Sequence, residues 1–340
     1  MQSIMIDREF RTLGLIYTPI LFGVVMPDPS LVRFQLNLDT NGNSDNFCDL
    51  SQCASILNRR FYRQGMNWVV ANIELVTDGG LTCSIAKLPD SWVLANSWVK
   101  AYELHKDSQD QVLDVDGRDI QGKYADFKVH MDANHESLGF AANITPAGYL
   151  LAAPGAVYDW EASEYQVPND PAPGTTTGYH IHAIGPSTAS SKGMIAGYAA
   201  SRARPQQEDP NLVEVSSTEG WMRELFDVGD NLDEIRENIE DLNDQPPYLT
   251  GPVNAVEEYY PGGAYQATTL DYFLQDTLIT RPGTSAVSFD STGTFLAPCG
   301  LLRLSTGSLD WSAISFAYIY VTLAPGPVKG LMAQPMQEMN

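Results

Sequence analysis

The amino-acid sequence predicts an all-β protein made of two β-sandwiches in tandem, each with one amphipathic helix in a loop. Short runs in which apolar and polar residues alternate recur along the chain, as in strands with one wet face. Two predicted helices, about 91–106 and 219–242, each begin near a serine and a tryptophan. Trp92 and Trp221 stand 129 positions apart, about the length of one small β-domain. This repeated pattern favours two similar domains.

The predicted domains are residues 1–160, residues 161–330 and a C-terminal tail, 331–340. Between Pro154 and Gly178 the composition becomes rich in proline, glycine and threonine, which indicates a boundary or a long loop. The alternative is a single sandwich with long insertions, because the clear candidate strands number only about a dozen where two eight-stranded sandwiches need about sixteen.

In the first half, the alternation predicts strands at Leu31–Leu38, Asn67–Val76 and Leu81–Leu88. Asp78-Gly79-Gly80 between the last two is typical of a hairpin turn. The following helix would bury one face. That face comprises Trp92, Ala95, Val99 and Tyr102. Further strands are expected within Ala125–Met131 and Asn143–Ala153.

In the second half, the predicted strands are Tyr179–Ile184, Gly193–Ser201, Gln266–Ile279, Ala286–Phe289, Gly300–Ser305 and Ala313–Leu323. The last is so rich in β-branched and aromatic residues that it should be central in a sheet.

The helix at 219–242 has a capping box at its start, formed by Ser216 and Glu219. Its apolar positions recur in alternating steps of four and three: Trp221, Leu225, Val228, Leu232, Ile235, Ile239 and Leu242. This face would pack on the protein's own sheet or between subunits.

Charge limits the partners that the chain can bind. Its 340 residues include 42 acids and 20 bases, for a net charge of −22. This balance argues against nucleic acid or anionic lipid headgroups as direct partners over most of the surface. Residues 207–258 hold fifteen acids and only Arg223 and Arg236 as bases, which indicates a solvated outer face, with calcium or a basic partner as the alternative. The first forty residues form no basic arm.

Cys48, Cys53, Cys83 and Cys299 are too few for a disulfide scaffold and lack zinc-finger spacing, so reduced, half-buried thiols are expected. The one long apolar run, Leu13–Met26, contains Pro19 and is shorter than the roughly 20 apolar residues of a membrane helix. We interpret it as a strand, neither a membrane anchor nor a signal peptide.

Motif searches find no glycine-rich phosphate loop, nucleophile elbow or zinc-protease helix, so no enzymatic activity is expected. His180 and His182 would share one face of a strand and could hold a metal, although ordinary surface or half-buried histidines are the simpler interpretation. Oxygen-bearing side chains also recur at every second position in one segment, as in calcium loops. They are Asp39, Asn41, Asn43 and Asp45. The alternative there is a polar turn.

Three stretches, Asn58–Trp68, Lys87–Trp92 and Val321–Gly330, resemble parts of capsid proteins from uncultured marine single-stranded DNA viruses. The overall organisation is similar to jelly-roll major capsid proteins, particularly the double jelly rolls of tailless, membrane-containing bacteriophages. The resemblance implies a major capsid protein of the virion. It would assemble in the host cell into capsomers, which the resemblance implies are trimers, and these would form an icosahedral shell. It implies no chemistry of its own.

This chain lacks the arginine-rich arm that small single-jelly-roll capsids commonly carry, so we expect weak or no direct binding of nucleic acid. An internal membrane or another virion protein would separate coat from genome, or else the cluster of Arg59, Arg60 and Arg63 would contact it. A carbohydrate-binding or adhesin-type β-sandwich is the alternative function, since six Trp, sixteen Tyr and an acidic loop suit such a role.

Overall fold

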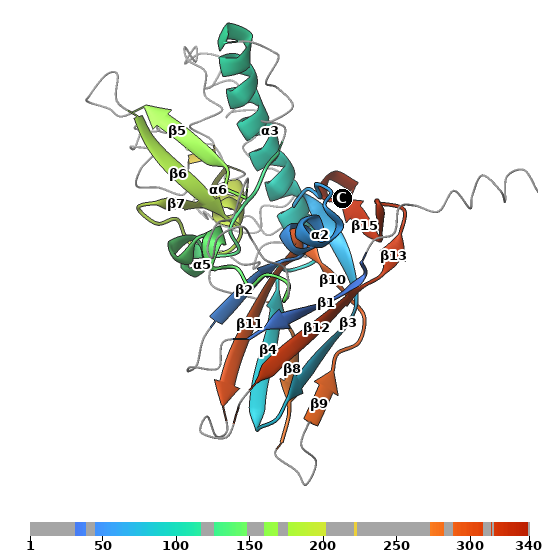
Figure 1. The fold of residues 1–340 in the computed structure, drawn as a ribbon. Coiled ribbons are helices and arrows are strands. Elements are labelled where there is room, and N and C mark those ends of the chain that lie inside the picture. Colours follow the sequence, from blue (N-terminus) through green and yellow to red (C-terminus); the bar gives the residue numbers. More distant parts are fainter. Residues whose placement is uncertain are drawn as a thin grey trace, which may run out of the picture.

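The computed structural model describes residues 31–38, 45–116, 126–147, 160–168, 176–201, 221–222, 273–281, 288–308, 314 and 316–338. Two antiparallel sheets dominate this part of the chain and pack face to face as one sandwich (Figure 1). The prediction of a mainly β chain with few helices is therefore confirmed for the described residues.

The first sheet has the order β1-β12-β3-β10, and β9 and β15 also pair with β3. Its strands are β1 (Arg33–Asn37), β3 (Met66–Thr77), β9 (Ser288–Ser291), β10 (Phe295–Ala297), β12 (Ala317–Leu323) and β15 (Ala333–Pro335). As expected, the strand that ends at Leu323 is central, because β12 lies between β1 and β3. Side chains along β12 alternate strictly between buried and half-buried, with one face turned to the core.

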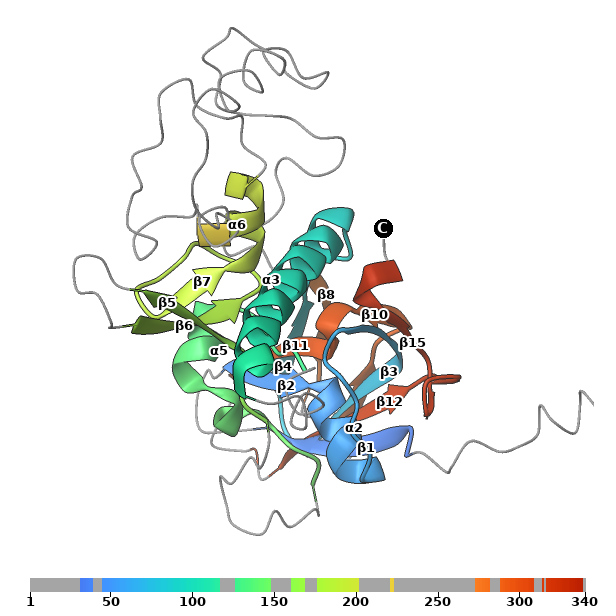
Figure 2. The same cartoon turned by 90° about the horizontal axis from the view of Figure 1, so that it is seen from above.

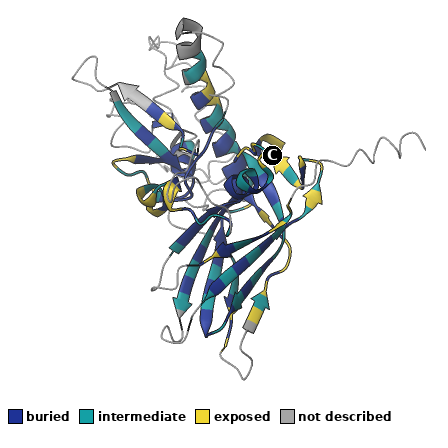
Figure 3. Cartoon of the chain, viewed as in Figure 1, coloured by how far each residue is buried: buried dark blue, intermediate teal, exposed yellow. Residues whose placement is uncertain are grey.

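The second sheet has the order β2-β11-β4-β8. Its strands are β2 (Asp45–Asp49), β4 (Leu81–Lys87), β8 (Phe273–Ile279) and β11 (Leu301–Ser308). Buried side chains from both sheets make one continuous apolar core, in which Trp68, Leu75, Ile85 and Leu304 are fully buried. Figure 3 shows this alternation along the strands and places exposed residues near β9 and β13.

The pairing of strands follows a nested order. The first described strand, β1, pairs with the late strand β12, then β2 pairs with β11, β3 with β9 and β10, and β4 with β8. Each sheet thus combines strands from both of the predicted domains, 1–160 and 161–330. The boundary near residue 160 does not divide the described strands into two sandwiches; they match the single-sandwich alternative. Among the described strands, the spacing of Trp92 and Trp221 therefore does not correspond to a repeated sandwich.

The Asp78-Gly79-Gly80 turn does not make the predicted hairpin. It carries the chain from β3 in one sheet to β4 in the other, and these strands do not pair with each other. A turn sequence permits the chain to reverse, but the choice of sheet depends on long-range partners, here β12 for β3 and β11 for β4.

Short elements close the end of the sandwich where β2 finishes. They are α2 (Leu50–Asn58), the two-residue strands β13 (Pro325–Gly326) and β14 (Gly330–Leu331), and the 3-10 turns η3 (Pro298–Gly300) and η5 (Met336–Glu338). Because β15 pairs with β3, part of the predicted C-terminal tail belongs to the sheet. All four cysteines are free, and each is fully buried rather than half-buried.

A long insertion, residues 88–272, leaves the sandwich after β4 and returns at β8. Its described elements are α3 (Trp92–Asp116), α5 (Ala133–Leu138), η2 (Phe140–Ala142), β5 (Glu164–Pro168), β6 (Thr176–His182), β7 (Ser191–Gly193) and α6 (Met194–Ser201). They gather at the α2 end of the sandwich, with α3 beside the small sheet β5-β6-β7 (Figures 1 and 2).

The helix predicted at 91–106 is present as α3 and extends further. Its buried residues include Val93, Leu94, Ala95, Ser97, Trp98, Ala101 and Leu104. Of the predicted face, Ala95 is fully buried, and Trp92, Val99 and Tyr102 are partly buried against the same core. The predicted strand Gly193–Ser201 is wrong, because these residues mostly form α6. The predicted strand within Ala125–Met131 forms only one bridge, His130 to His182.

The other predicted helix, 219–242, lies outside the described residues except for Trp221 and Met222, which are buried. Trp221 donates its indole N–H to the carbonyl of Gly193 at 3.1 Å. A Cβ atom at Gly197 would lie 2.2 Å from that indole nitrogen, so the close contact between α6 and Trp221 requires glycine.

Candidate functional site

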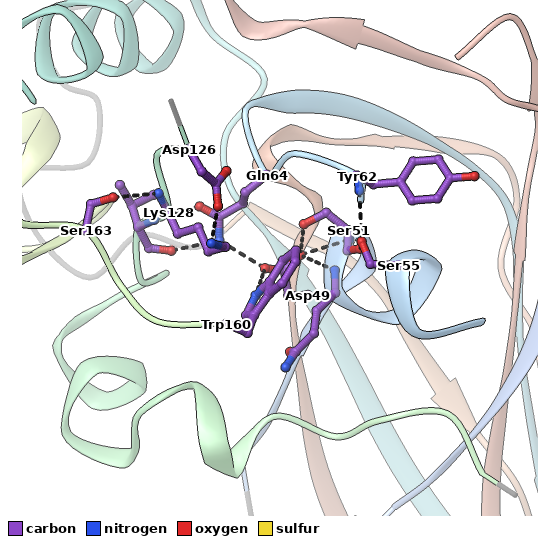
Figure 4. Close-up of polar contacts among 11 residues, drawn as sticks. Asp49, Ser51, Ser55, Tyr62, Gln64, Asp126, Lys128, Trp160 and Ser163 are labelled. Carbon is purple, nitrogen blue, oxygen red and sulfur yellow. Dashed lines mark hydrogen bonds and ion pairs between the residues drawn. The ribbon is translucent and has the colours of Figure 1, made fainter. Parts of the chain in front are cut away.

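The most elaborate polar site lies where the insertion meets the sandwich (Figure 4). At its centre is Asp49, the last residue of β2 and the N-cap of α2, and it is fully buried. Its carboxylate accepts hydrogen bonds from the backbone N–H groups of Ser51 at 2.9 Å and Gln52 at 3.3 Å. Such capping satisfies amide donors that the first turn of a helix leaves unpaired.

Three side chains also donate to the Asp49 carboxylate: the Ser51 hydroxyl, the Gln64 amide at 3.1 Å and the Trp160 indole at 3.1 Å. Burial raises the pKa of Asp49, and the hydrogen bonds from Ser51, Gln64, Gln52 and Trp160 act in the opposite direction. Since Trp160 belongs to the insertion, one buried carboxylate joins strand, helix and insertion.

Gln64 extends this connection through a pair of backbone contacts. Its side-chain oxygen accepts from the N–H of Val129 at 2.6 Å, and its amide nitrogen donates to the carbonyl of the same residue at 3.0 Å. The Gln64 side-chain amide thus makes the same two hydrogen bonds that a backbone partner makes in a β-sheet, and it holds the segment around Val129 against the sandwich.

Beside this pair, Lys128 is almost fully buried and forms an ion pair with Asp126. Its ammonium nitrogen also lies 4.8 Å from the centre of the Trp160 ring and 5.6 Å from that of Phe61. The aromatic faces and the carboxylate compensate for the loss of water around the buried charge.

Four of the five histidines gather at the same junction. The ring of His130 lies 5.0 Å from that of His135 and 5.7 Å from that of His180, and its backbone bridges to His182. His135 also stacks on Phe47 of β2 at 4.5 Å. The cluster therefore lies between the insertion and the sandwich.

Hydrogen bonds set the proton position on His135. Its Nδ1 accepts from the backbone N–H of Met131 at 3.0 Å, so its Nε2 carries the proton and donates to Asn143 at 2.7 Å. Burial lowers the pKa of His135 to about 4. Burial first, and then the neighbouring His135, His180 and His182, lower the pKa of His130 to about 2. Both rings are neutral near pH 7.

His182 makes a contact of the kind found between a nucleophile and a base. Its Nδ1 lies 2.5 Å from the hydroxyl oxygen of Ser191, and its Nε2 lies 3.1 Å from the carbonyl of Pro186. Both His182 and Ser191 are fully buried, so a substrate could not reach this hydroxyl without a rearrangement. The contact holds β6 against β7.

The predicted metal ligands do not come together in the described part of the chain. Asp39, Asn41 and Asn43 lie outside it, and Asp45 forms an ion pair with Arg303 and accepts from the Ser305 hydroxyl at 2.6 Å. His180 pairs instead with Glu136 at 3.1 Å. Among the described residues no group of three histidine, cysteine, aspartate or glutamate side chains is arranged to hold a metal ion.

Sequence reasoning missed α2, Asp49 and Gln64. One local signal existed, since Asp49 precedes Leu50-Ser51 in the manner of a helix N-cap. The contacts of Gln64 with Val129 and of Asp49 with Trp160 span 65 and 111 positions, and no local pattern encodes them.

Comparison of the chain with protein-family models, curated proteins and solved structures finds no match in any of the three. Within the described ranges, no helix is both long enough and apolar enough to cross a membrane.

Proposed function

We propose that this chain is a viral major capsid protein that assembles with copies of itself into an icosahedral shell. The observation that carries this proposal is the nested order of strand pairs in two facing sheets: β1 with β12, β2 with β11, β3 with β9 and β10, and β4 with β8. A jelly roll consists of eight strands in two Greek keys, and the described sandwich fits that order with β9 and β10 sharing one place. Jelly rolls are a common architecture of viral coats, as the sequence resemblance to such proteins also suggests.

One side of the sandwich supplies a surface for self-association. Among the described strands, β8 pairs only with β4, and β9 and β10 pair only with β3. Large apolar side chains are exposed along this edge: Leu274 (56%), Ile279 (44%), Phe289 (77%) and Leu296 (37%). We call them the β8–β10 edge. Open strand edges and exposed apolar groups are features that a second copy can cover.

The remaining partners follow from charge. A net charge of −22 gives little general attraction to phosphate, so the proposed shell would hold its genome by confinement, by a lipid layer beneath it or through another virion protein.

Sedimentation velocity and negative-stain microscopy of purified protein test the proposal. We expect capsomers or particles for the native chain, and a strong shift to monomer for Phe289→Asp, because a charge would then have to be buried in the contact. The matched control is Leu138→Asp, which places the same charge at an exposed leucine of α5, away from this edge. Equal assembly of the two variants would contradict the role of the edge. A strictly monomeric native chain that binds glycans saturably would instead support the carbohydrate-binding alternative.

A further inference from the structure

A second exposed apolar group lies at the α2 end of the sandwich. It consists of Leu31 (47%), Phe61 (45%) and Met332 (43%). The backbone contacts bring these residues to one end: the N–H of Leu31 donates to Asn58 at the end of α2, and Met332 donates to Ala324 at the start of the β13–β14 hairpin. The described residues include eight exposed large apolar side chains, and these three are separate from the four on the β8–β10 edge.

Cations surround this group. Arg59, Arg63 and Lys329 are exposed, in a protein that has only 20 lysines and arginines among its 340 residues. The Lys329 ammonium donates to the carbonyl of Phe61 at 2.6 Å, and the Tyr62 hydroxyl donates to the carbonyl of Lys329 at 3.0 Å. These bonds bring the loop at 59–63 next to the β13–β14 hairpin. We call Leu31, Arg59, Phe61, Arg63, Lys329 and Met332 the basic tip.

Backbone conformation singles out the same place. Three non-glycine residues of the described chain have positive φ, and two of them, Arg59 and Lys329, are in the basic tip, each with φ of 51°. Glycine or asparagine fits this left-handed region with less strain. Long cationic side chains at both positions are therefore a costly choice for folding, and such outliers cluster at functional sites.

From this combination we propose that the basic tip docks on an anionic membrane surface. Cations attract acidic headgroups, while exposed aliphatic and aromatic side chains enter the boundary between headgroups and acyl chains. Single-stranded nucleic acid suits the tip less well, because bases stack on aromatic rings and Phe61 is the one aromatic residue among its three exposed apolar side chains.

The overall charge of −22 does not prevent this contact. At physiological ionic strength, interactions between exposed charges are largely screened beyond about 8 Å, so charges at the tip dominate once it touches the surface. The cations of the tip attract the acidic surface only at short range, and added salt weakens this attraction. We therefore expect binding that falls steeply as the salt concentration rises. The inference rests on the proposed function in one respect, the lipid layer beneath a shell.

The test is co-sedimentation of full-length protein with vesicles of phosphatidylcholine containing about one third phosphatidylserine, and with phosphatidylcholine alone. We expect binding to the acidic vesicles only. The double variant Arg59→Gln/Arg63→Gln should weaken it about tenfold or more, since each cation near an acidic surface contributes severalfold. The matched control is Arg281→Gln, which removes an exposed arginine outside the tip.

A second pair of variants tests the apolar part. Leu31→Ser and Met332→Ser should each weaken binding severalfold, whereas Leu138→Ser, at an equally exposed leucine elsewhere, should not. Thermal melting of each variant shows whether it remains folded. Equal binding by the double arginine variant and the native chain, or equal binding to both kinds of vesicle, would overturn the inference. So would capture of a single-stranded oligonucleotide at physiological salt in place of vesicles.

Assembly is measured separately, by sedimentation of the same samples without lipid. If the native chain assembles normally but does not bind acidic vesicles, the docking inference is refuted and the shell proposal stands. If the native chain stays monomeric but binds acidic vesicles, the shell proposal is refuted and the docking inference stands.

Discussion

Aliphatic and aromatic side chains fill the space between the two sheets of the sandwich, whereas the insertion and its junction bury histidines, two lysines and carboxylates. All five histidines of the chain lie in the insertion, from His105 to His182. The stability of the sandwich thus depends on apolar burial, which is non-directional and does not require any single polar group to be correctly placed. The stability of the insertion depends on the protonation state of its buried side chains and on the hydrogen bonds that each of them makes. One chain therefore combines a region that pH barely affects with one that acid should loosen.

The largest expected effect belongs to the sandwich core. Trp68→Ala would empty the space of a fully buried indole that contacts Tyr62, and such truncations cost about 3–5 kcal/mol. We expect a large fall in the denaturant midpoint at both pH 8 and pH 5. Trp68→Phe is the control: it keeps most of the ring and removes an indole N–H that has no hydrogen-bond partner, so its loss should be much smaller. Equal losses in the two variants would show that volume does not dominate there.

A smaller effect is expected at the junction. Asp49→Ala removes a helix cap and leaves one N–H of the Gln64 amide and the Trp160 indole N–H unpaired, which should cost about 2–4 kcal/mol in total. Hydrogen exchange should increase chiefly in α2 and around Val129, with the centre of β12 still protected. Asp49→Asn keeps the shape and one acceptor, and should cost less. Uniform loss of protection through β12 would contradict a distinct junction.

The third prediction concerns acid. The pKa values of His130 and His135 are about 2 and about 4, below the usual value near 6.5, so an unfolded chain takes up their protons more readily. Their contribution to stability is complete above about pH 6.5 and is lost as the pH falls toward those folded values, at about 1.4 kcal/mol per pH unit for each ring. Burial raises the pKa of Asp49 and Asp132, which opposes this trend.

The variant His130→Phe isolates this effect. The ring of His130 stacks on Phe140 at 4.3 Å and its Nδ1 is buried without a partner, so phenylalanine can take its place. We expect a gain in stability over the native chain that is larger at pH 5 than at pH 8, measured by urea unfolding. The same difference at both pH values would show that proton uptake by His130 is irrelevant.

The same contrast explains what the sequence could predict. Alternation placed β1, β3, β4, β11 and β12 within a few residues, because one face of each is buried in the sandwich. It failed for α6, where Met194, Ile195 and Ala196 read as a strand but pack as a helix beside α3. It also could not show that β3 and β4 lie in different sheets. Partners far away in the sequence decide both outcomes.

The candidate site was the least predictable part. The sequence singles out His180 and His182 as a pair. It could not show that His130 lies beside His180, because the two residues are about fifty positions apart in the sequence. The suggested calcium ligand Asp45 has Arg303 as its partner, 258 positions away. Alternation encodes which face of a strand is buried, and it contains no information on which buried polar groups meet.

The pairing of Lys87 with Phe273 has a consequence for how this protein could have been built. The last residue of β4 lies opposite the first residue of β8, so the two ends of residues 88–272 leave the sandwich side by side. Without the insertion, β4 and β8 would form a β-hairpin, and a tight turn would be enough to connect them. A segment held in this way can grow, shrink or be exchanged over generations while the pairing of β4 with β8 stays the same, provided that Phe47 and Leu301, which now pack against it, acquire another cover.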